Sequence, residues 1–321
     1  MQPDSRIYVA GHTGLAGSAL LRALRGAGLR NLVLRTHAEL ELTDARAVAA
    51  FFERERPEYV FVAAAKVGGI LANDRYPADF IRENLAIELN VICEAARSGV
   101  KRLLLLGSSC IYPRDCPQPM KEEHLLTGSL ESTNRAYAVA KIAGIELCWS
   151  YNRQHGTRFL AAMPTNLFGP GDNYDLETSH VLPALIRKVH ETKVRSESTV
   201  TIWGSGRPKR EFLYSDDMAE ACVFLMRLPE GVFARLTAHE VAPLINVGSG
   251  KDLSIAELAS MVGETLGYEG GFIYDASKPD GTPRKLLDTS RLAALGWGPR
   301  IGLREGIALA YRDFLARKVA E

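Results

Sequence analysis

Tyr137 and Lys141 stand four residues apart in a segment with helical periodicity, so their side chains share one helical face. A phenol titrates near about pH 10 in water and needs a nearby positive charge before it can exchange protons at neutral pH. Lys141 could supply that charge. Ser108 and Ser109 follow a short apolar segment, and a hydroxyl there could share a substrate carbonyl oxygen with Tyr137. The Tyr–Lys spacing alone is equally typical of an exposed helical face, but the serines favour acid–base chemistry at a carbonyl.

A glycine-rich segment near the N-terminus predicts a dinucleotide site at Gly11-His12-Thr13-Gly14-Leu15-Ala16-Gly17. It directly follows the apolar residues 7–10 and opens a helical pattern, which is the context that gives this motif its meaning. Gly11 permits a tight turn, Gly14 lets the backbone approach a pyrophosphate, and Gly17 lets the helix pack closely. The helix N-terminus then offers N–H donors to the anion. A glycine-rich turn without a ligand is the alternative.

The end of the predicted second strand bears on the choice of coenzyme. A site specific for NAD would carry Asp or Glu there, whereas this chain has Leu34-Arg35-Thr36-His37. A cation attracts a 2′-phosphate that a carboxylate would repel. Arg35 therefore favours NADP(H), unless it is only a solvated strand end. An oxidised nicotinamide would add a second positive charge beside Tyr137.

Short, continuous apolar segments alternate with longer amphipathic ones through the first half of the chain. The strands are expected at residues 6–10, 31–34, 59–63, 102–106 and 158–163. The helices are expected at residues 15–27, 45–55, 78–98 and 134–155. This alternation predicts right-handed crossovers and an α/β fold with a doubly wound parallel (Rossmann) sheet.

After Pro164 the pattern changes to longer loops rich in Gly, Pro and Arg. A helix at about 180–192, short strands near 200–203 and 271–274, and a helix opened by the capping box of Ser254 and Glu257 predict a smaller second lobe. Residues 215–227 and 244–247 look like a helix and a strand that return to the first sheet. We therefore expect a dinucleotide-binding domain at 1–170, with returning segments at about 211–248, and a discontinuous C-terminal substrate domain at 171–210 plus 249–321.

Composition excludes several classes of protein. The chain has 321 residues, enough for about two domains, and 46% of them are hydrophobic, which excludes wholesale disorder. The net charge of +1 gives no global field for nucleic acid or a membrane surface, so we expect neither as a partner. Five scattered cysteines match no metal spacing and predict reduced thiols and no metal. With no long apolar run and a short, polar N-terminus, the expected location is the cytoplasm.

The glycine motif, the serine after the fourth strand and the Tyr–Lys pair resemble the extended short-chain dehydrogenase/reductase family. Longer segments narrow the resemblance to the GDP-L-fucose synthase family within it, and the match runs from about residue 7 to residue 314. These segments are Ala63-Ala64-Ala65-Lys66-Val67-Gly68-Gly69-Ile70, Gly107-Ser108-Ser109-Cys110-Ile111-Tyr112-Pro113, Met163-Pro164-Thr165-Asn166-Leu167 and Lys278-Pro279-Asp280-Gly281-Thr282-Pro283-Arg284-Lys285.

The resemblance implies a two-stage conversion of GDP-4-keto-6-deoxy-D-mannose to GDP-L-fucose. The C4 ketone acidifies the protons on C3 and C5, and removing and returning each on the opposite face inverts both centres. Hydride from NADPH then reduces C4. Ser108 and Tyr137 would hold the C4 oxygen, Tyr137 would deliver a proton, and Lys141 would orient the nicotinamide ribose and lower the tyrosine pKa. Cys110 and His180 match the acid/base pair of the epimerisation; without the family they would be a loop thiol and a helix cap.

The resemblance also implies ligand contacts and a homodimer. The nicotinamide end of the cofactor would be lined by Leu106, Gly107, Lys141, Pro164, Thr165, Asn166, Leu167 and His180. The GDP-sugar would be bound by Lys188, Trp203, Arg210 and Asp280, where the cations could neutralise the diphosphate and the indole could pack on it. Dimerisation is expected through helices near 77–98 and 134–155. Related enzymes often carry arginines where Thr13 and His37 stand, so the preference for NADP over NAD is expected to be relaxed.

Three alternatives are less favoured. A sugar-nucleotide 4,6-dehydratase needs an Asp–Glu pair after the fourth strand, where Ser109-Cys110 stands. An NAD(P)-dependent 4-epimerase or related nucleotide-sugar reductase of the same fold needs no Cys110–His180 pair, and a NAD-dependent one would carry an acidic residue at Arg35. A non-catalytic NADP-binding module tends to lose the tyrosine and the lysine, and both are present.

Overall fold

The computed structural model describes residues 1–238, 240–278 and 280–318, and it is built around a parallel sheet of six strands. The strand order is β2-β1-β3-β4-β5-β9, so the chain winds in both directions from β1 and the prediction of a doubly wound sheet is confirmed. The strands are β1 (Ile7–Ala10), β2 (Leu32–Val33), β3 (Tyr59–Val62), β4 (Arg102–Leu106), β5 (Phe159–Pro164) and β9 (Leu244–Val247).

Helices cover both faces of this sheet because its strands are apolar on both faces. In β1, Tyr8 and Ala10 join the core under α2, α4 and α5, whereas Ile7 and Val9 join the core under α1 and α7. All four are at most 1% exposed, and full burial of a large apolar side chain contributes about 1.5–3 kcal/mol. The helices are α1 (Leu15–Gly26), α2 (Ala45–Glu55), α4 (Pro77–Arg97), α5 (Arg135–His155) and α7 (Ser215–Arg227).

Local sequence signals set where several helices begin. The Asp44 carboxylate accepts hydrogen bonds from the backbone N–H groups of Arg46 and Ala47 and so caps α2. Pro77 occupies the first position of α4, where no backbone donor is needed. The capping box of Ser254 and Glu257 is formed at the start of α9 (Ile255–Leu266).

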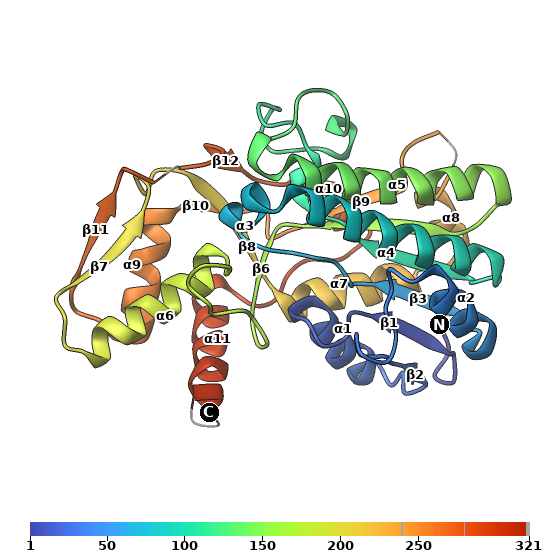
Figure 1. Cartoon of the computed structure of the whole chain (residues 1–321), viewed down its shortest axis with the longest axis horizontal. Helices are drawn as coiled ribbons and strands as arrows, with labels where there is room; N and C mark the ends of the chain where they lie inside the picture. The colour runs from blue at the N-terminus through green and yellow to red at the C-terminus, as the bar shows by residue number, and fades with distance from the viewer. Residues whose placement is uncertain (239, 279, 319–321) are drawn as a thin grey trace.

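A second lobe, on the left in Figure 1, has its own apolar core and small sheets. Its helices are α6 (Val181–Val194), α9 (Ile255–Leu266) and α11 (Leu303–Lys318). The central strand β8 (Lys209–Tyr214) pairs with β6 (Asn166–Phe168), β10 (Asp252–Ser254) and β12 (Arg284–Lys285). The strands β7 (Thr199–Trp203) and β11 (Gly271–Asp275) form a separate parallel pair.

The returning segments extend further than the sequence indicates. The helix α7 and the strand β9 rejoin the first sheet as expected, but α10 (Ser290–Ala294) also packs on β9, and Leu292 and Trp297 join the core under α1 and α7. This helix has five residues, too few for a readable periodicity. Several further elements were also not predicted. They are the helices α3 (Ile70–Arg75), α8 (Glu230–Leu236) and α11, the strands β6, β8, β10 and β12, and single 3₁₀ turns at Ser109–Ile111, Glu122–His124 and Ser132–Asn134. Within the described residues, no helix combines the length and apolar character that crossing a bilayer requires.

Candidate active site

The Tyr–Lys pair lies in the first turns of α5, where this helix packs along α4. Lys141 is buried at 2% exposure, and its ammonium donates to the Leu106 carbonyl oxygen at 3.0 Å and to Glu88 of α4 at 2.9 Å. Its Nζ lies 5.8 Å from the centre of the Tyr137 ring. The bond to Leu106 fixes the ammonium at the carboxyl end of β4, the edge at which doubly wound folds bind their ligands.

Ser108 joins this pair from the turn after β4. It precedes a 3₁₀ turn, and its hydroxyl lies 3.5 Å from the Cys110 backbone N. Burial raises the pKa of Tyr137 well above its usual value, the charges of Cys110 and Glu88 add to the rise, and hydrogen bonding by Ser108 opposes it. The phenol is therefore protonated at neutral pH and can act as a proton donor.

The Cys110 thiol is buried on the same turn. Burial raises its pKa, and this rise is opposed chiefly by the charge of Lys285 and by a hydrogen bond from Ser108. Burial lowers the pKa of Lys285, and Cys110 and Glu131 act in the opposite direction. Lys285 is a neighbour of the thiol that sequence reasoning missed, although it ends one of the segments that carry the family resemblance.

His180 is the N-cap residue of α6 in the second lobe. Its ring is exposed, yet enough protein surrounds it for desolvation to lower its pKa, so the neutral imidazole is favoured. The preceding chain is tied to the first lobe, because the Gly69 N–H donates to the Thr178 carbonyl oxygen at 3.2 Å. The buried Ser179 hydroxyl has no hydrogen-bond partner within the described part of the chain.

The glycine-rich turn has the geometry that a pyrophosphate requires. Gly11 has φ of +78°, and a Cβ there would lie 2.6 Å from the Ala64 N atom. A Cβ on Gly17 would overlap the Gly11 carbonyl oxygen. The α1 helix begins after the exposed Gly14 with no side-chain cap and no acidic residue in its first turn, so its N–H groups are available to an anion. The remaining members, Thr13, Leu15 and Ala16, are exposed or half-buried, and His12 has a buried Nδ1 atom without a partner in the described residues. These residues fit a dinucleotide.

Arg35 does not point into open solvent at the sheet edge. Its guanidinium pairs with Glu55 of α2 at 2.6 Å, donates to the Leu34 carbonyl oxygen and lies 5.9 Å from the centre of the Phe51 ring. Glu55 is buried and also pairs with Arg6. These contacts use two of the five N–H donors of the guanidinium, and a 2′-phosphate would have to be bound by the others. The contact between Arg35 and a 2′-phosphate remains a prediction.

The residues after β5 are held by Glu211 of β8. Thr165 and Asn166 donate to the Glu211 backbone carbonyl oxygen at 3.1 and 2.8 Å. The fully buried Glu211 carboxylate accepts hydrogen bonds from the backbone N–H groups of Gly250 at 2.7 Å and Leu287 at 2.9 Å. Burial raises the pKa of this carboxyl. The predicted nicotinamide-lining segment from Pro164 to Leu167 is therefore anchored to β8 through Glu211, and the Gly107 N–H after β4 donates to the Ala162 carbonyl oxygen of β5 at 2.9 Å.

The second lobe presents cations that no carboxylate neutralises by an ion pair within the described residues. Lys188 donates to the Thr201 carbonyl oxygen at 3.2 Å, and its Nζ lies 4.9 Å from the centre of the Trp203 ring. Arg210 donates to the carbonyl oxygen of Lys209 at 2.8 Å. Desolvation lowers the pKa of both cations. Asp280 is engaged with Ser205, accepting from its backbone N at 2.6 Å and from its hydroxyl at 2.7 Å; the neighbouring Pro279 lies outside the described residues.

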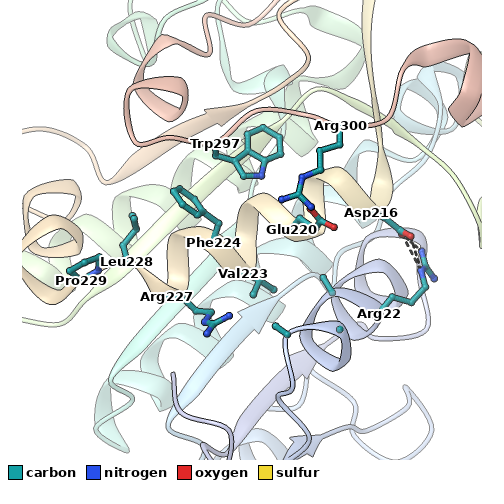
Figure 2. A pocket seen from close by; sticks show the side chains of 13 residues that line it. Arg22, Asp216, Glu220, Val223, Phe224, Arg227, Leu228, Pro229, Trp297 and Arg300 are labelled. Atoms are coloured by element: carbon teal, nitrogen blue, oxygen red, sulfur yellow. Dashed lines mark hydrogen bonds and ion pairs between the residues drawn. The ribbon is translucent and has the colours of Figure 1, made fainter.

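A cavity of about 750 Å³ beside α1 and α7 contains none of the predicted site residues. Figure 2 shows its aromatic wall of Phe224 and Trp297 and the ion pair of Arg22 with Asp216 at one end. Arg300, on its rim, pairs with Glu220 at 3.2 Å. These charges neutralise each other, unlike those of Lys188 and Arg210.

The wound parallel sheet, the glycine turn and the Ser–Tyr–Lys cluster at its edge define a class of nucleotide-dependent oxidoreductases and epimerases. The model of the NAD dependent epimerase/dehydratase family matches residues 7–235, and the chain belongs to this family.

Within the family, several similar proteins are named GDP-L-fucose synthase. The chain is 54% identical to GDP-L-fucose synthase 1 of Arabidopsis thaliana over 97% of this chain and 94% of the relative. It is 53% identical to GDP-L-fucose synthase of Escherichia coli strain K12, over 97% and 96% of the two chains. A crystal structure of a GDP-L-fucose synthetase from Naegleria fowleri bound to NADP has a TM-score of 0.86 and 27% identity, covering 99% of this chain and 96% of that one.

Proposed function

We propose that this chain converts GDP-4-keto-6-deoxy-D-mannose to GDP-L-fucose by 3,5-epimerisation followed by NADPH-dependent reduction at C4. Full-length relatives at more than 50% identity bear the name of this activity. The observation that carries the proposal is the buried Lys141 ammonium, held at the carboxyl end of β4 beside the Tyr137 ring, with Ser108 and the Cys110 thiol on the turn that follows this strand.

The reduction uses a protonated phenol next to a carbonyl. Ser108 and Tyr137 hold the C4 oxygen, and Tyr137 gives it a proton as negative charge develops there. The high pKa of Tyr137 keeps that proton in place until it is needed. When bound, NADPH supplies the hydride.

The epimerisation needs one group to remove a proton and another to return it on the opposite face. Cys110 and His180 are proposed for these roles, from the first and the second lobe respectively. The neighbouring Lys285 stabilises the thiolate form of Cys110, and the lowered pKa of His180 favours an imidazole that can accept a proton.

The proposed ligand contacts are likewise divided between the first and the second lobe. Gly11 to Gly17 hold the pyrophosphate of the cofactor, and Leu106, Gly107, Lys141, Pro164 to Leu167 and His180 line its nicotinamide end. Lys188, Arg210 and Trp203 bind the GDP moiety, and Asp280 fixes the loop beside it. The two lobes are proposed as domains at 1–170 with about 211–248, and at 171–210 with 249–321. The separate cores support this division, with residues 290–297 packing on the first lobe.

We also propose a cytoplasmic homodimer joined through α4 and α5. Both helices expose apolar side chains, Leu89 at 49% and Val139 at 37%. The described cysteines are all free thiols, as expected in a reducing compartment. The molar mass in solution, with Leu89→Lys as the dissociating variant, tests the dimer.

The decisive experiment offers purified protein GDP-4-keto-6-deoxy-D-mannose and NADPH in deuterated water. The expected result is loss of NADPH absorbance and a GDP-L-fucose product that carries deuterium at C3 and C5. Reduction without deuterium at these carbons would indicate a C4 reductase of the same fold and contradict the epimerase stage.

A further inference from the structure

Glu88 is a buried carboxylate inside the α4–α5 pair that the proposed reaction does not use. It is 1% exposed, and its Oε1 lies 2.9 Å from the Lys141 ammonium, which is itself 2% exposed. The Leu106 carbonyl oxygen accepts from the same ammonium on the sheet side. Lys141 is thus held between two acceptors, one of them charged.

The helices pack closely around this carboxylate. A side chain at Gly144 of α5 would overlap Glu88 Oε2, so only glycine leaves room for it. Oε2 has no hydrogen-bond partner within the described residues. A buried ion pair costs desolvation that two apolar side chains of similar volume would avoid. The pair is therefore poorly explained by packing alone.

Few charged or titratable groups face this pair. Lys141 faces Glu88 of α4, Tyr137 of its own helix and Cys110 of the turn after β4. Tyr137 faces Cys110 and Glu88, and Glu88 also acts on the buried Cys148 of α5. Burial raises the pKa of Glu88 and the Lys141 ammonium opposes the rise. Glu88 is the only carboxyl group among those named here, and it is placed directly on the Lys141 ammonium.

We propose that Glu88 is a positioning residue that holds the Lys141 ammonium at the sheet edge and cancels its charge, so that Tyr137 remains a proton donor. A lone ammonium beside a tyrosine favours the phenolate, which suits removal of a proton from an alcohol. A neutral Lys–Glu pair favours the phenol, which suits delivery of a proton to a ketone. The inference rests on the proposed function, because it concerns the direction in which the same site works.

The test is the pH dependence of hydride transfer in Glu88→Gln, measured on the full chain by stopped-flow NADPH absorbance. The amide keeps the shape and an acceptor oxygen but loses the charge. Without the carboxylate, either Tyr137 loses its proton at a lower pH than in the wild type, or the Lys141 ammonium loses its proton at a lower pH. Either change moves the alkaline limit of the rate down by roughly one to two pH units. Glu94→Gln is the control, because Glu94 lies on the same helix but pairs with Arg97 at the surface.

An unchanged alkaline limit in folded Glu88→Gln would overturn the proposal. If that variant does not fold, Glu88→Asp withdraws the carboxylate from Nζ while keeping its charge. The expected result is then a rate about tenfold lower with a higher KM for NADPH, and wild-type values for both would overturn the positioning role. Inactivity of the wild-type chain toward the keto-sugar would contradict the proposed function instead.

Discussion

The edge of the Rossmann sheet and the face of the second lobe treat positive charge in opposite ways. At the sheet edge, Lys141 is buried against Glu88 and Arg35 is held by Glu55. In the second lobe, Lys188 and Arg210 bind only backbone carbonyl oxygens among the described hydrogen-bond partners. In the proposed function, charge is therefore balanced by the protein where a proton is moved, and it would be balanced by the ligand where a diphosphate is bound.

The largest effect is expected from Tyr137→Phe, which removes the proton donor at the sheet edge. Hydride transfer should fall on the order of 100-fold or more, because general acid catalysis contributes at least that much. Deuterium uptake at C3 and C5 should continue, since Cys110 and His180 are intact. NADPH absorbance and NMR of the recovered sugar nucleotide measure the two stages separately. An equal loss of hydride transfer and of deuterium uptake would contradict the assignment of the two stages to different residues.

Cys110→Ser should produce the complementary defect. A serine hydroxyl does not ionise near neutral pH, so solvent deuterium uptake should fall about 100-fold. An already epimerised keto-sugar should still be reduced at nearly the wild-type rate. Cys222→Ser, which changes a buried thiol of α7, controls for general disturbance of the fold. Uptake at the unmodified rate would show that Cys110 is not the acid/base group.

Arg210→Ala tests the second lobe, where Lys188 and Arg210 form no ion pair within the described residues. Loss of one charge-assisted contact to a phosphate should raise KM for the sugar nucleotide roughly tenfold and leave kcat nearly unchanged. The dependence of KM on salt should also weaken. Arg304→Ala removes a surface arginine that already pairs with Glu264 and should change neither quantity. A fall in kcat at constant KM would argue against a binding role.

The Lys188→Arg substitution should change kcat/KM for the sugar nucleotide only at alkaline pH. Desolvation lowers the pKa of Lys188, so its charge is lost at lower pH than for a solvated lysine, and kcat/KM for the sugar nucleotide declines there. Arginine stays protonated over the accessible range and should extend the plateau. Superimposable wild-type and variant pH profiles would show that Lys188 does not contact the diphosphate.

Arg35→Ser should have the smallest effect. Because Glu55 already balances this guanidinium, KM for NADPH should rise by no more than about threefold, within the range of an exposed charge contact. The ratio of KM values for NADPH and NADH measures it. A rise of tenfold or more in this KM would mean that Arg35 contacts the 2′-phosphate strongly despite its ion pair with Glu55. Arg35 would then resemble Lys188 and Arg210, whose charge is proposed to be balanced by a ligand.

Much of the scaffold could be predicted because its signals are local. The bounds of α2, α7, β4 and β9 follow from apolar periodicity and caps such as Asp44. The pairing of charges could not be predicted, because Glu88 and Lys141 are separated by 53 positions and spacing carries no information at that range. The partner of Arg35 was missed for the same reason.

The residues after Pro164 show the same limit. Their elements are short, and the central strand β8 pairs with strands from three distant parts of the chain, so its register depends on the whole lobe. The sequence predicts His180 at the start of a helix and Trp203 in a strand, but it does not indicate which residues surround them.

Glu211 joins the Thr165 and Asn166 side chains after β5, the turn at Gly250 and the chain at Leu287 through one buried side chain and one carbonyl group. A hinge between the two halves would have to break these bonds and strand a carboxylate away from water. We therefore expect Glu211 to oppose hinge motion at this point of the chain. In the proposed function, the distance between the hydride donor and the diphosphate would then be set by the protein, and sugar nucleotides would be selected by whether their length brings C4 to Tyr137.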